Sequence, residues 1–380
     1  MNRTLTLFAT ILMLGAAPIA RAGENGGRLN PRLLAMEDNT WLNLKPERTP
    51  KSRTYTGNCF GGGKFYYFGG GHFGYHKNDV ELYDPATNVW TRVTEPELPE
   101  GEYSDWVRTA AKRAAPSGAP YCGGHTYQYT SWDPVRKRFF LPYRQCGVWE
   151  FDPEKAKWEN IFSVFADPKP KTPHDMGPGT MAGIHSAFDP NLGKPVTVIT
   201  HKATGLYVFD YEKKEWVKHK PLPKGLGTEL YSTYVDEWKA HLFANNGWKK
   251  GKTHFTRVDL VAGTSELIES PEEMGKGGLC MALSYDRANK AVVVMPRVKL
   301  PEKGGTVSVW ALDVETLKWT EMKPAGERPK GTNTGKWAPL WYDPDHNVHL
   351  FLNNASRGAK FQGGRTETWA YRYKRAPGQE

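Results

Sequence analysis

Several histidines stand where the backbone could present them to a ligand. His72 and His76 lie in GGGHFGYH and His125 lies in CGGHTY, and glycine, which allows close backbone approach, flanks both segments. His185 opens a later predicted strand, and His201 follows the next one. A neutral imidazole serves as a base, an acid or a metal ligand near neutral pH. We expect these side chains to gather around one opening, whereas each histidine taken alone has the ordinary interpretation of a structural hydrogen-bonding group.

Basic side chains are concentrated in six segments that contain few acids. The only acids there are Asp79 and Glu302. The basic and imidazole residues are His72, His76 and Lys77; Arg144; His201 and Lys202; Lys249, Lys250 and Lys252; Arg297, Lys299 and Lys303; and Arg357, Lys360 and Arg365. A rim of one charge sign raises the local concentration of an oppositely charged ligand. The alternative is that long polar loops carry lysine for solubility.

Aromatic residues accompany these cations. Tyr75, Tyr143 and Trp248 lie in or beside the same segments. An aromatic ring packs on the apolar face of a sugar, while an arginine forks onto a carboxylate or sulfate. The combination predicts a site for an anionic polysaccharide or oligosaccharide. Nucleic acid uses similar groups, but the export signal described below argues against a nucleic-acid partner.

The same residues could carry out β-elimination on a uronate polymer. A cation neutralises the uronate carboxylate, a base removes the C5 proton, and an acid assists the leaving oxygen. We assign Arg144 as the cation, His125 or His185 as the base, and Tyr129 or Tyr143 as the acid. The predicted substrate-binding residues are His72, Tyr75, His76, His201, Trp248, Lys249, Arg297 and Arg357.

Two other functions remain open at this stage. One is a non-catalytic module that binds a glycan or a protein through the same rim. The other is a single divalent metal ion held by His72, His76, His125 or His185, so whether the chain is an enzyme stays open. This divalent metal ion is the only cofactor that the sequence suggests.

The composition limits the elements that can position these groups. The chain has 380 residues, a formal charge of +10, 39% hydrophobic and 13% aromatic residues, with 39 glycines and 28 prolines. The aromatic content excludes disorder as the main state. Scattered glycine and proline exclude an all-α fold and favour many short strands joined by turns.

The N-terminus has the features of an export signal. Arg3 precedes the apolar stretch 5–14, and Ala20-Arg21-Ala22 matches a cleavage site. We predict a signal peptide over 1–22 and a single mature domain over 23–380, secreted or periplasmic and monomeric. No later stretch reaches the 18 or more apolar residues that a membrane span requires.

One unit of four strands recurs six times along the chain. The segment that holds the first two strands begins at residue 55, 127, 185, 231, 281 or 338. The third strand ends near an aspartate, which is residue 84, 152, 210, 259 or 313 in the first five repeats. The fourth strand carries a tryptophan, which is Trp90, Trp158, Trp216 or Trp319. Such blades predict an all-β propeller of six blades, or seven if 95–123 hides a degenerate one. The last repeat lacks a fourth strand, which residues 39–44 can supply to close the ring.

The first repeat resembles a known family. Phe68-Gly69-Gly70-Gly71, the stretch from Asp79 to Tyr83, and Trp90 are similar to a kelch repeat of the galactose-oxidase central-domain type found in secreted bacterial proteins. The resemblance implies the fold and not the chemistry, although some polysaccharide lyases are propellers. The copper site of galactose oxidase itself needs a Tyr–Cys cofactor, a second tyrosine and two histidines, and no such set can be placed here.

The remaining signals are structural. Cys122 and Cys146 fall on the same face of one blade, which predicts a disulfide, whereas Cys59 and Cys280 are expected to be buried free thiols. The Asp-containing segments that follow each third strand are expected to form ordinary β-turns. In a propeller the loops between second and third strands lie on one face, so the basic segments should share it.

Overall fold

The computed structural model describes residues 29–378 with gaps. Within that range it does not describe residues 54, 71–74, 76, 98–114, 121–125, 127–128, 144–146, 164–183, 202, 229, 247–252, 276–278, 298–306, 331–338 and 355–365. The described strands form six antiparallel sheets of four strands each. The predicted all-β propeller is therefore confirmed, with six blades in the described part of the chain.

The strands fall into blades in chain order, except for one. Blade 1 contains β2 (Gly57–Gly61), β3 (Lys64–Phe68), β4 (Val80–Asp84) and β5 (Val89–Arg92); blade 2 contains β6 (Ser131–Asp133), β7 (Arg138–Tyr143), β8 (Gly147–Asp152) and β9 (Lys157–Phe162); blade 3 contains β10 (Ile184–Asp189), β11 (Lys194–Ile199), β12 (Gly205–Asp210) and β13 (Glu215–Lys220).

The second half of the ring follows the same order. Blade 4 contains β14 (Leu230–Val235), β15 (Ala240–Asn246), β16 (Thr253–Asp259) and β17 (Thr264–Ile268); blade 5 contains β18 (Leu279–Asp286), β19 (Ala291–Arg297), β20 (Val309–Asp313) and β21 (Trp319–Met322); blade 6 contains β22 (Leu340–Asp343), β23 (Val348–Asn354), β24 (Thr366–Arg372) and β1 (Thr40–Asn43). Among the described residues, two short helices, α1 (Pro31–Leu34) and α3 (Glu272–Gly275), accompany them.

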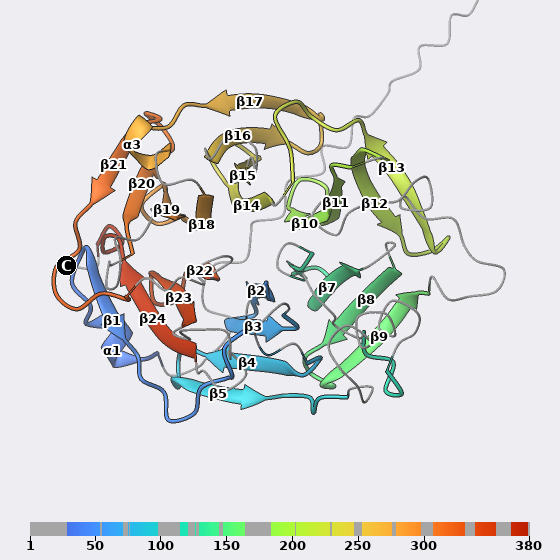
Figure 1. Ribbon diagram of the computed structural model, residues 1–380, viewed down its shortest axis with the longest axis horizontal. Coiled ribbons are helices and arrows are strands. Elements are labelled where there is room, and N and C mark those ends of the chain that lie inside the picture. Colours follow the sequence, from blue (N-terminus) through green and yellow to red (C-terminus); the bar gives the residue numbers. More distant parts are fainter. Residues whose placement is uncertain are drawn as a thin grey trace, which may run out of the picture.

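The N-terminal strand closes the ring, as predicted. β1 pairs with β24 from Thr40 opposite Arg372 to Asn43 opposite Trp369. Figure 1 shows the six sheets around one axis, with β2, β10, β14, β18 and β22 near the centre and β5, β13, β17, β21 and β1 at the rim. Each blade covers a face of its neighbour, which is how a four-stranded sheet buries both of its faces.

A side chain on or beside the inner strands joins each blade to the next. Six hydrogen bonds of this kind close the circle: Asn58 N to Thr130 Oγ1, Ser131 Oγ with Ser186 Oγ, His185 Nε2 with Ser232 Oγ, Tyr285 N to Thr233 Oγ1, His349 Nδ1 with Ser284 Oγ, and Trp341 Nε1 to Asn58 Oδ1. The polar residues of the inner strands thus act chiefly between blades.

The aspartates that end the third strands form the expected turns. Asp152 Oδ1 accepts from the backbone N–H groups of Glu154 and Lys155, and Asp210 Oδ1 does the same for Glu212 and Lys213. These Asx turns bind the carboxylates to their own backbone. They leave this face of the disc with short, self-contained connections.

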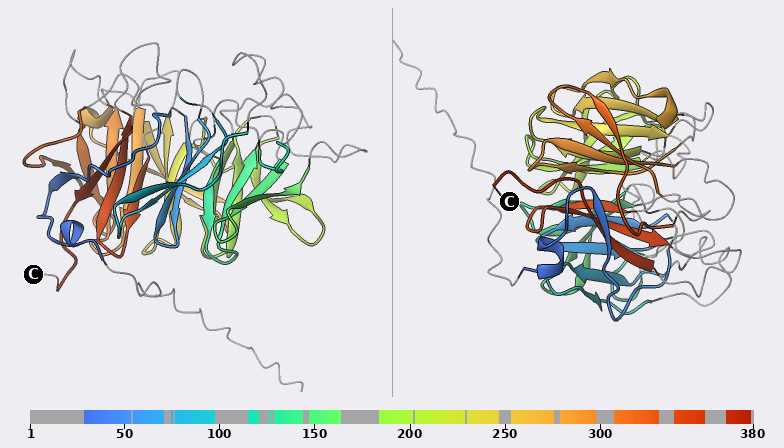
Figure 2. Two further views of the ribbon diagram at one scale, coloured as in Figure 1. Left: turned by 90° about the horizontal axis from the view of Figure 1, so that it is seen from below. Right: turned by 90° about the vertical axis from the view of Figure 1, so that its left-hand side faces the viewer.

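Strand register places the other connections together. Phe68 lies opposite Val80, Tyr143 opposite Gly147, and Ile199 opposite Gly205, at the ends of the second and third strands. We call the side of the disc where these strand ends lie the long-loop face; the Asx turns lie on the other side. Figure 2 shows the strands running across the thickness of the disc between the two faces.

Residues 1–28, which include the predicted signal peptide, lie outside the described residues, so export, domain limits and monomeric state stay predictions. Within the described ranges, no helix combines the length and the apolar character that crossing a bilayer requires.

Ring closure predicts a strong effect of one residue on β1. Trp41 is 7% exposed and its ring contacts those of Phe351, Trp369 and Tyr371. We expect Trp41→Ala to lower the free energy of unfolding by about 3–5 kcal/mol, since a large ring is removed from a packed seam. Urea denaturation followed by tryptophan fluorescence measures this. Val135→Ala, at a residue 69% exposed, should change it by less than about 0.5 kcal/mol, and equal losses would refute the role of Trp41.

Candidate functional site

The structure describes part of the predicted site. Tyr75, Tyr129, Tyr143, His185 and His201 are described, and Arg297 is described as backbone at the end of β19. The other predicted residues lie outside the described residues: His72, His76, His125, Arg144, Trp248, Lys249 and Arg357. Cys122 and Cys146 lie outside them too, so the disulfide stays a prediction.

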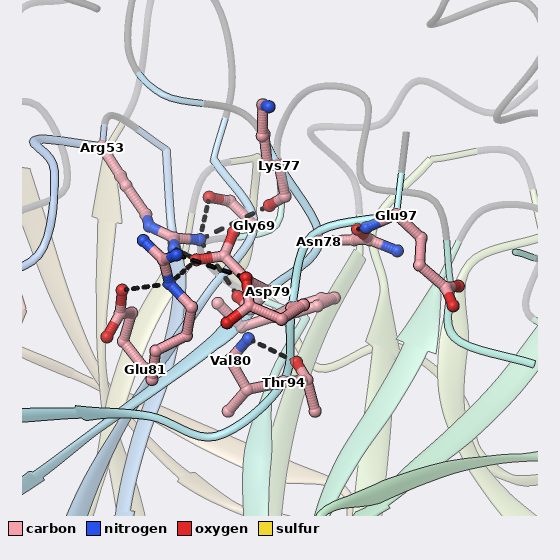
Figure 3. Close-up of polar contacts among 12 residues, drawn as sticks. Arg53, Gly69, Lys77, Asn78, Asp79, Val80, Glu81, Thr94 and Glu97 are labelled. Carbon is pink, nitrogen blue, oxygen red and sulfur yellow. Dashed lines mark hydrogen bonds and ion pairs between the residues drawn. The ribbon is translucent and has the colours of Figure 1, made fainter. Parts of the chain in front are cut away.

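A buried ion pair that sequence reasoning missed underlies the first long loop. Arg53 and Asp79 are both fully buried, and Arg53 Nη2 donates to Asp79 Oδ2 at 2.7 Å. Arg53 Nη1 also donates to the carbonyl oxygens of Gly69, Lys77 and Asp79, at 3.0, 3.4 and 3.3 Å. Figure 3 shows these contacts converging on one guanidinium. Arg53 thus joins the two ends of the 69–79 loop, which runs from the end of β3 to the start of β4.

Two tyrosine rings lie close to that guanidinium. The Arg53 Cζ atom lies 4.7 Å from the ring centroid of Tyr75 and 5.3 Å from that of Tyr67. Burial raises the pKa of the Tyr75 phenol, and the charge of Asp79 raises it further, so the phenol is neutral at physiological pH. In the structure Tyr75 packs on Arg53, and the substrate-binding role that we assigned to it stays a prediction.

Glu81, the next acidic residue along the chain after Asp79, is also paired with an arginine. Glu81 is 1% exposed and accepts from both terminal nitrogens of Arg48, at 2.6 and 2.7 Å. Arg92 Nε lies 3.4 Å from Glu81 Oε1 and 3.7 Å from Asp79 Oδ2. The two acids of this region therefore present no uncompensated charge to solvent.

Lys77 has the opposite orientation. Its backbone carbonyl faces Arg53, but Figure 3 shows its side chain extending away from the Arg53–Asp79 pair. Within the described part of the chain, no ion pair of Lys77 is found. The first long loop thus withdraws its carboxylate into the protein, whereas its half-buried lysine extends away from the ion pair.

Further hydrogen bonds tie this loop to the segment that follows His125. Thr126 Oγ1 accepts from Gly57 N at 2.8 Å and from Gly70 N at 3.2 Å, and Thr126 N donates to Tyr55 O. Asn78 Oδ1 accepts from Glu97 N, where the chain leaves blade 1. The described neighbours of the two glycine-flanked histidine segments are therefore in direct contact.

Two predicted tyrosines also meet beside Thr126. The rings of Tyr129 and Tyr143 have centroids 5.8 Å apart, and Tyr129 N donates to Thr126 O. Both side chains are 1% exposed. Tyr143 precedes Arg144 and Thr126 follows His125 in the sequence, so the described neighbours of both predicted catalytic residues lie in one cluster.

His185 lies between blades 3 and 4. It is 6% exposed, its Nε2 lies 2.7 Å from Ser232 Oγ, and its ring packs edge-on against Phe243. Burial, and secondarily the charge of His241, lowers its pKa to about 3. So weak a base is poorly suited to proton abstraction at neutral pH, and the function proposed below gives the role of base to His125. His201 is half-buried, and its Nδ1 has no hydrogen-bond partner among the described residues.

No metal site is found in the described ranges. They contain no group of three or more His, Cys, Asp or Glu side chains that could hold a metal ion. Three of the four predicted ligands lie outside those ranges, so the metal hypothesis stays a prediction. Cys59 is a buried free thiol, as predicted, and burial raises its pKa well above the usual value.

One cavity lies away from the predicted site. It has a volume of about 350 Å³ and lies between the end of β1 and the start of β24. Its lining residues are Asn43, Lys45, Pro46, Thr49, Thr366, Glu367 and Thr368. None of them is a predicted site residue, so the cavity does not enter the site.

Comparison with known proteins supports the architecture. The kelch motif family matches residues 52–97, and this match and the six-bladed ring together support a β-propeller of the kelch type. Among solved structures, an oligogalacturonate lyase in complex with manganese is similar, with a TM-score of 0.44, 11% identity, and coverage of 90% of this chain and 99% of that one. TolB from Acinetobacter baumannii is similar with a TM-score of 0.42, 13% identity, and coverage of 78% and 60%. No curated protein matches the sequence.

The buried His185 predicts acid lability. In the unfolded chain its pKa is near 6.5 and in the folded protein it is about 3, so only the unfolded state takes up this proton between those values. Stability should therefore fall as the pH falls through this window, by up to about 1.4 kcal/mol per pH unit from this group. Urea denaturation at several pH values from 7 to 4 should show a shallower fall for His185→Gln. The exposed His254→Gln should retain the wild-type slope, and equal slopes for all three proteins would contradict the assignment.

Proposed function

We propose that this propeller binds an anionic polysaccharide, bearing uronate carboxylates or sulfates, on its long-loop face. The observation that carries the proposal is that, at the first long loop, the acidic side chain is buried and the lysine side chain is not turned toward it. Asp79 is fully buried against Arg53, whereas Lys77 extends away from the pair. Of the two acids that interrupt the basic segments in the sequence, one is thereby removed from the surface.

We expect the other basic segments, whose residues lie mostly outside the described ranges, to add to the same face. Each joins the second and third strands of a blade in the sequence, and in blades 1, 2 and 3 the register of the described strand ends supports this expectation. Cations from six blades around one axis would attract a polyanion more strongly than any single loop, because their potentials add. The predicted export of the chain fits a polysaccharide outside the cytoplasm better than a nucleic acid.

Binding can be tested by affinity electrophoresis in gels that contain polygalacturonate, heparin or neutral dextran. We expect retardation by at least one of the two anionic polymers, none by dextran, and loss of retardation as salt is added. Lys77→Glu should weaken binding about fivefold to tenfold, since a solvated ion pair is worth about 0.5–0.7 kcal/mol and reversal adds a repulsion of similar size, which makes about 1–1.4 kcal/mol in total.

The matched control reverses a lysine on the opposite face. Lys155 lies in a turn beside Asp152 and its side chain is 67% exposed. Lys155→Glu changes the net charge as Lys77→Glu does, but it should leave the affinity within about twofold of wild type. An equal effect of the two variants, or no retardation of the wild-type protein, would refute a site on the long-loop face.

Cleavage of the bound polymer by β-elimination is the second candidate function. The contact of Tyr129 with Tyr143 and with Thr126 favours it, because it joins the described neighbours of His125 and Arg144. In the proposed reaction Arg144 pairs with the uronate carboxylate and His125 takes the C5 proton. The electron pair forms a C4–C5 double bond, the C4–O bond breaks, and an acid donates a proton to the leaving oxygen. The sequence assigns Tyr129 or Tyr143 as this acid; both side chains are 1% exposed, so this assignment requires that one of them becomes accessible to the bound polymer.

A lyase should release unsaturated uronides, whose conjugated double bond absorbs in the ultraviolet. We expect His125→Ala and Arg144→Ala each to lower the rate of product formation by a factor of about 100 or more, since each removes a group from the reaction. His254→Ala, at an exposed histidine on β16, is the control and should retain the rate. Retardation of the wild-type protein without any unsaturated product would exclude cleavage of the polymers tested and leave the binding proposal intact.

A further inference from the structure

A buried arginine controls how the first loop presents its charge. We propose that Arg53 is the positioning residue of the 69–79 loop: it fixes both loop ends and occupies Asp79, so that Lys77 remains directed outward. Arg53 itself is fully buried and is not expected to touch a ligand. The inference rests on the proposed polyanion site, which it deepens by naming the residue that keeps a binding cation available.

The first step of the argument is geometric. A single nitrogen, Arg53 Nη1, donates to Gly69 O at the start of the loop and to Lys77 O and Asp79 O at its end. A guanidinium is planar and its donors have fixed directions, so it can hold several acceptors in one arrangement. The rings of Tyr67 and Tyr75 hold the guanidinium plane itself, at 5.3 and 4.7 Å from Cζ. A lysine ammonium would supply the charge but not this planar set of donors with fixed directions.

The second step is a competition for Asp79. A fully buried carboxylate is costly unless a cation pairs with it. Arg53 satisfies this need at 2.7 Å, whereas Arg92 lies 3.7 Å away and also contacts Glu81. Lys77 belongs to the same loop and lies two residues from Asp79. If Arg53 no longer held the carboxylate, Lys77 would be the nearest basic residue in the sequence able to turn inward, and the loop would lose its outward charge.

The principal test is Arg53→Lys in the full chain, which retains the charge and removes the fork. In the wild-type protein the Gly70 amide donates to Thr126 Oγ1 and the Tyr75 amide donates to Ser52 O. In the variant, hydrogen exchange at these two amides, measured without ligand, should become at least tenfold faster. Retardation by polygalacturonate or heparin should weaken about fivefold, as for Lys77→Glu. Arg136→Lys is the matched control. Arg136 of blade 2 pairs with buried Glu150 and packs on Tyr211 of blade 3, and its replacement should change neither measurement at the loop.

A double variant separates the competition from a purely structural role. In Arg53→Gln/Asp79→Asn the carboxylate that would attract Lys77 is gone and no cation is left at position 53, so binding should recover to within about twofold of wild type while exchange at Gly70 remains fast. This variant also avoids a buried unpaired charge and serves if Arg53→Lys alone does not fold. Failure of the double variant to bind better than Lys77→Glu would overturn the competition, and wild-type exchange rates in both Arg53 variants would overturn the positioning role. If the wild-type protein binds neither polymer, the proposed function fails, whereas the exchange measurements still decide the role of Arg53.

Discussion

Every blade of this protein depends on its neighbours to cover its faces, and a closed ring of blades meets this requirement. A four-stranded sheet with apolar residues on both sides cannot be stable alone, but six such sheets around an axis cover one another. The circle needs one strand from the N-terminus, and β1 supplies it beside β24. Hydrogen bonds at all six blade interfaces then occupy the polar side chains nearest the axis. Because the blades are related around this axis, equivalent strand ends share a face.

The two faces use aspartate in different ways. On one side, carboxylates such as Asp152 and Asp210 accept from their own turn backbone, which keeps the connections short. At the long-loop face, Asp79 instead pairs with a buried arginine from a distant part of the chain. The first arrangement is local and belongs to the repeat, whereas the second is found, among the described residues, in blade 1, where it removes a carboxylate from the surface. The surface charge of such a loop therefore depends on which of its ionised groups are buried and paired.

The strand repeat was predictable because it is periodic. The recurring aspartate and tryptophan positions, together with residues 39–44 as the missing strand, indicated the blades and their closure. Arg53 was not predictable, because it lies before the first strand and its partners come from tertiary contacts. His185 illustrates a different limit: its position at the start of an inner strand suggested the axis, but the side chain packs against Ser232 and Phe243 of the next blade. Sequence position identifies the strand but not the neighbour that a side chain meets.

Ring closure and the candidate site share one short stretch of chain. After β1 ends, Pro50 O accepts from Thr366 N at the start of β24, Ser52 O accepts from Tyr75 N, and Arg53 holds Asp79. This stretch therefore contacts the start of the strand that follows the last long-loop connection and also contacts the first long loop, although these two parts of the chain are far apart in the sequence. The same residues that lead the chain from the closing strand into blade 1 also fix the ends of those loops. A disturbance of β1 should consequently reach the long-loop face through backbone contacts, so the fold and the proposed binding surface are not independent.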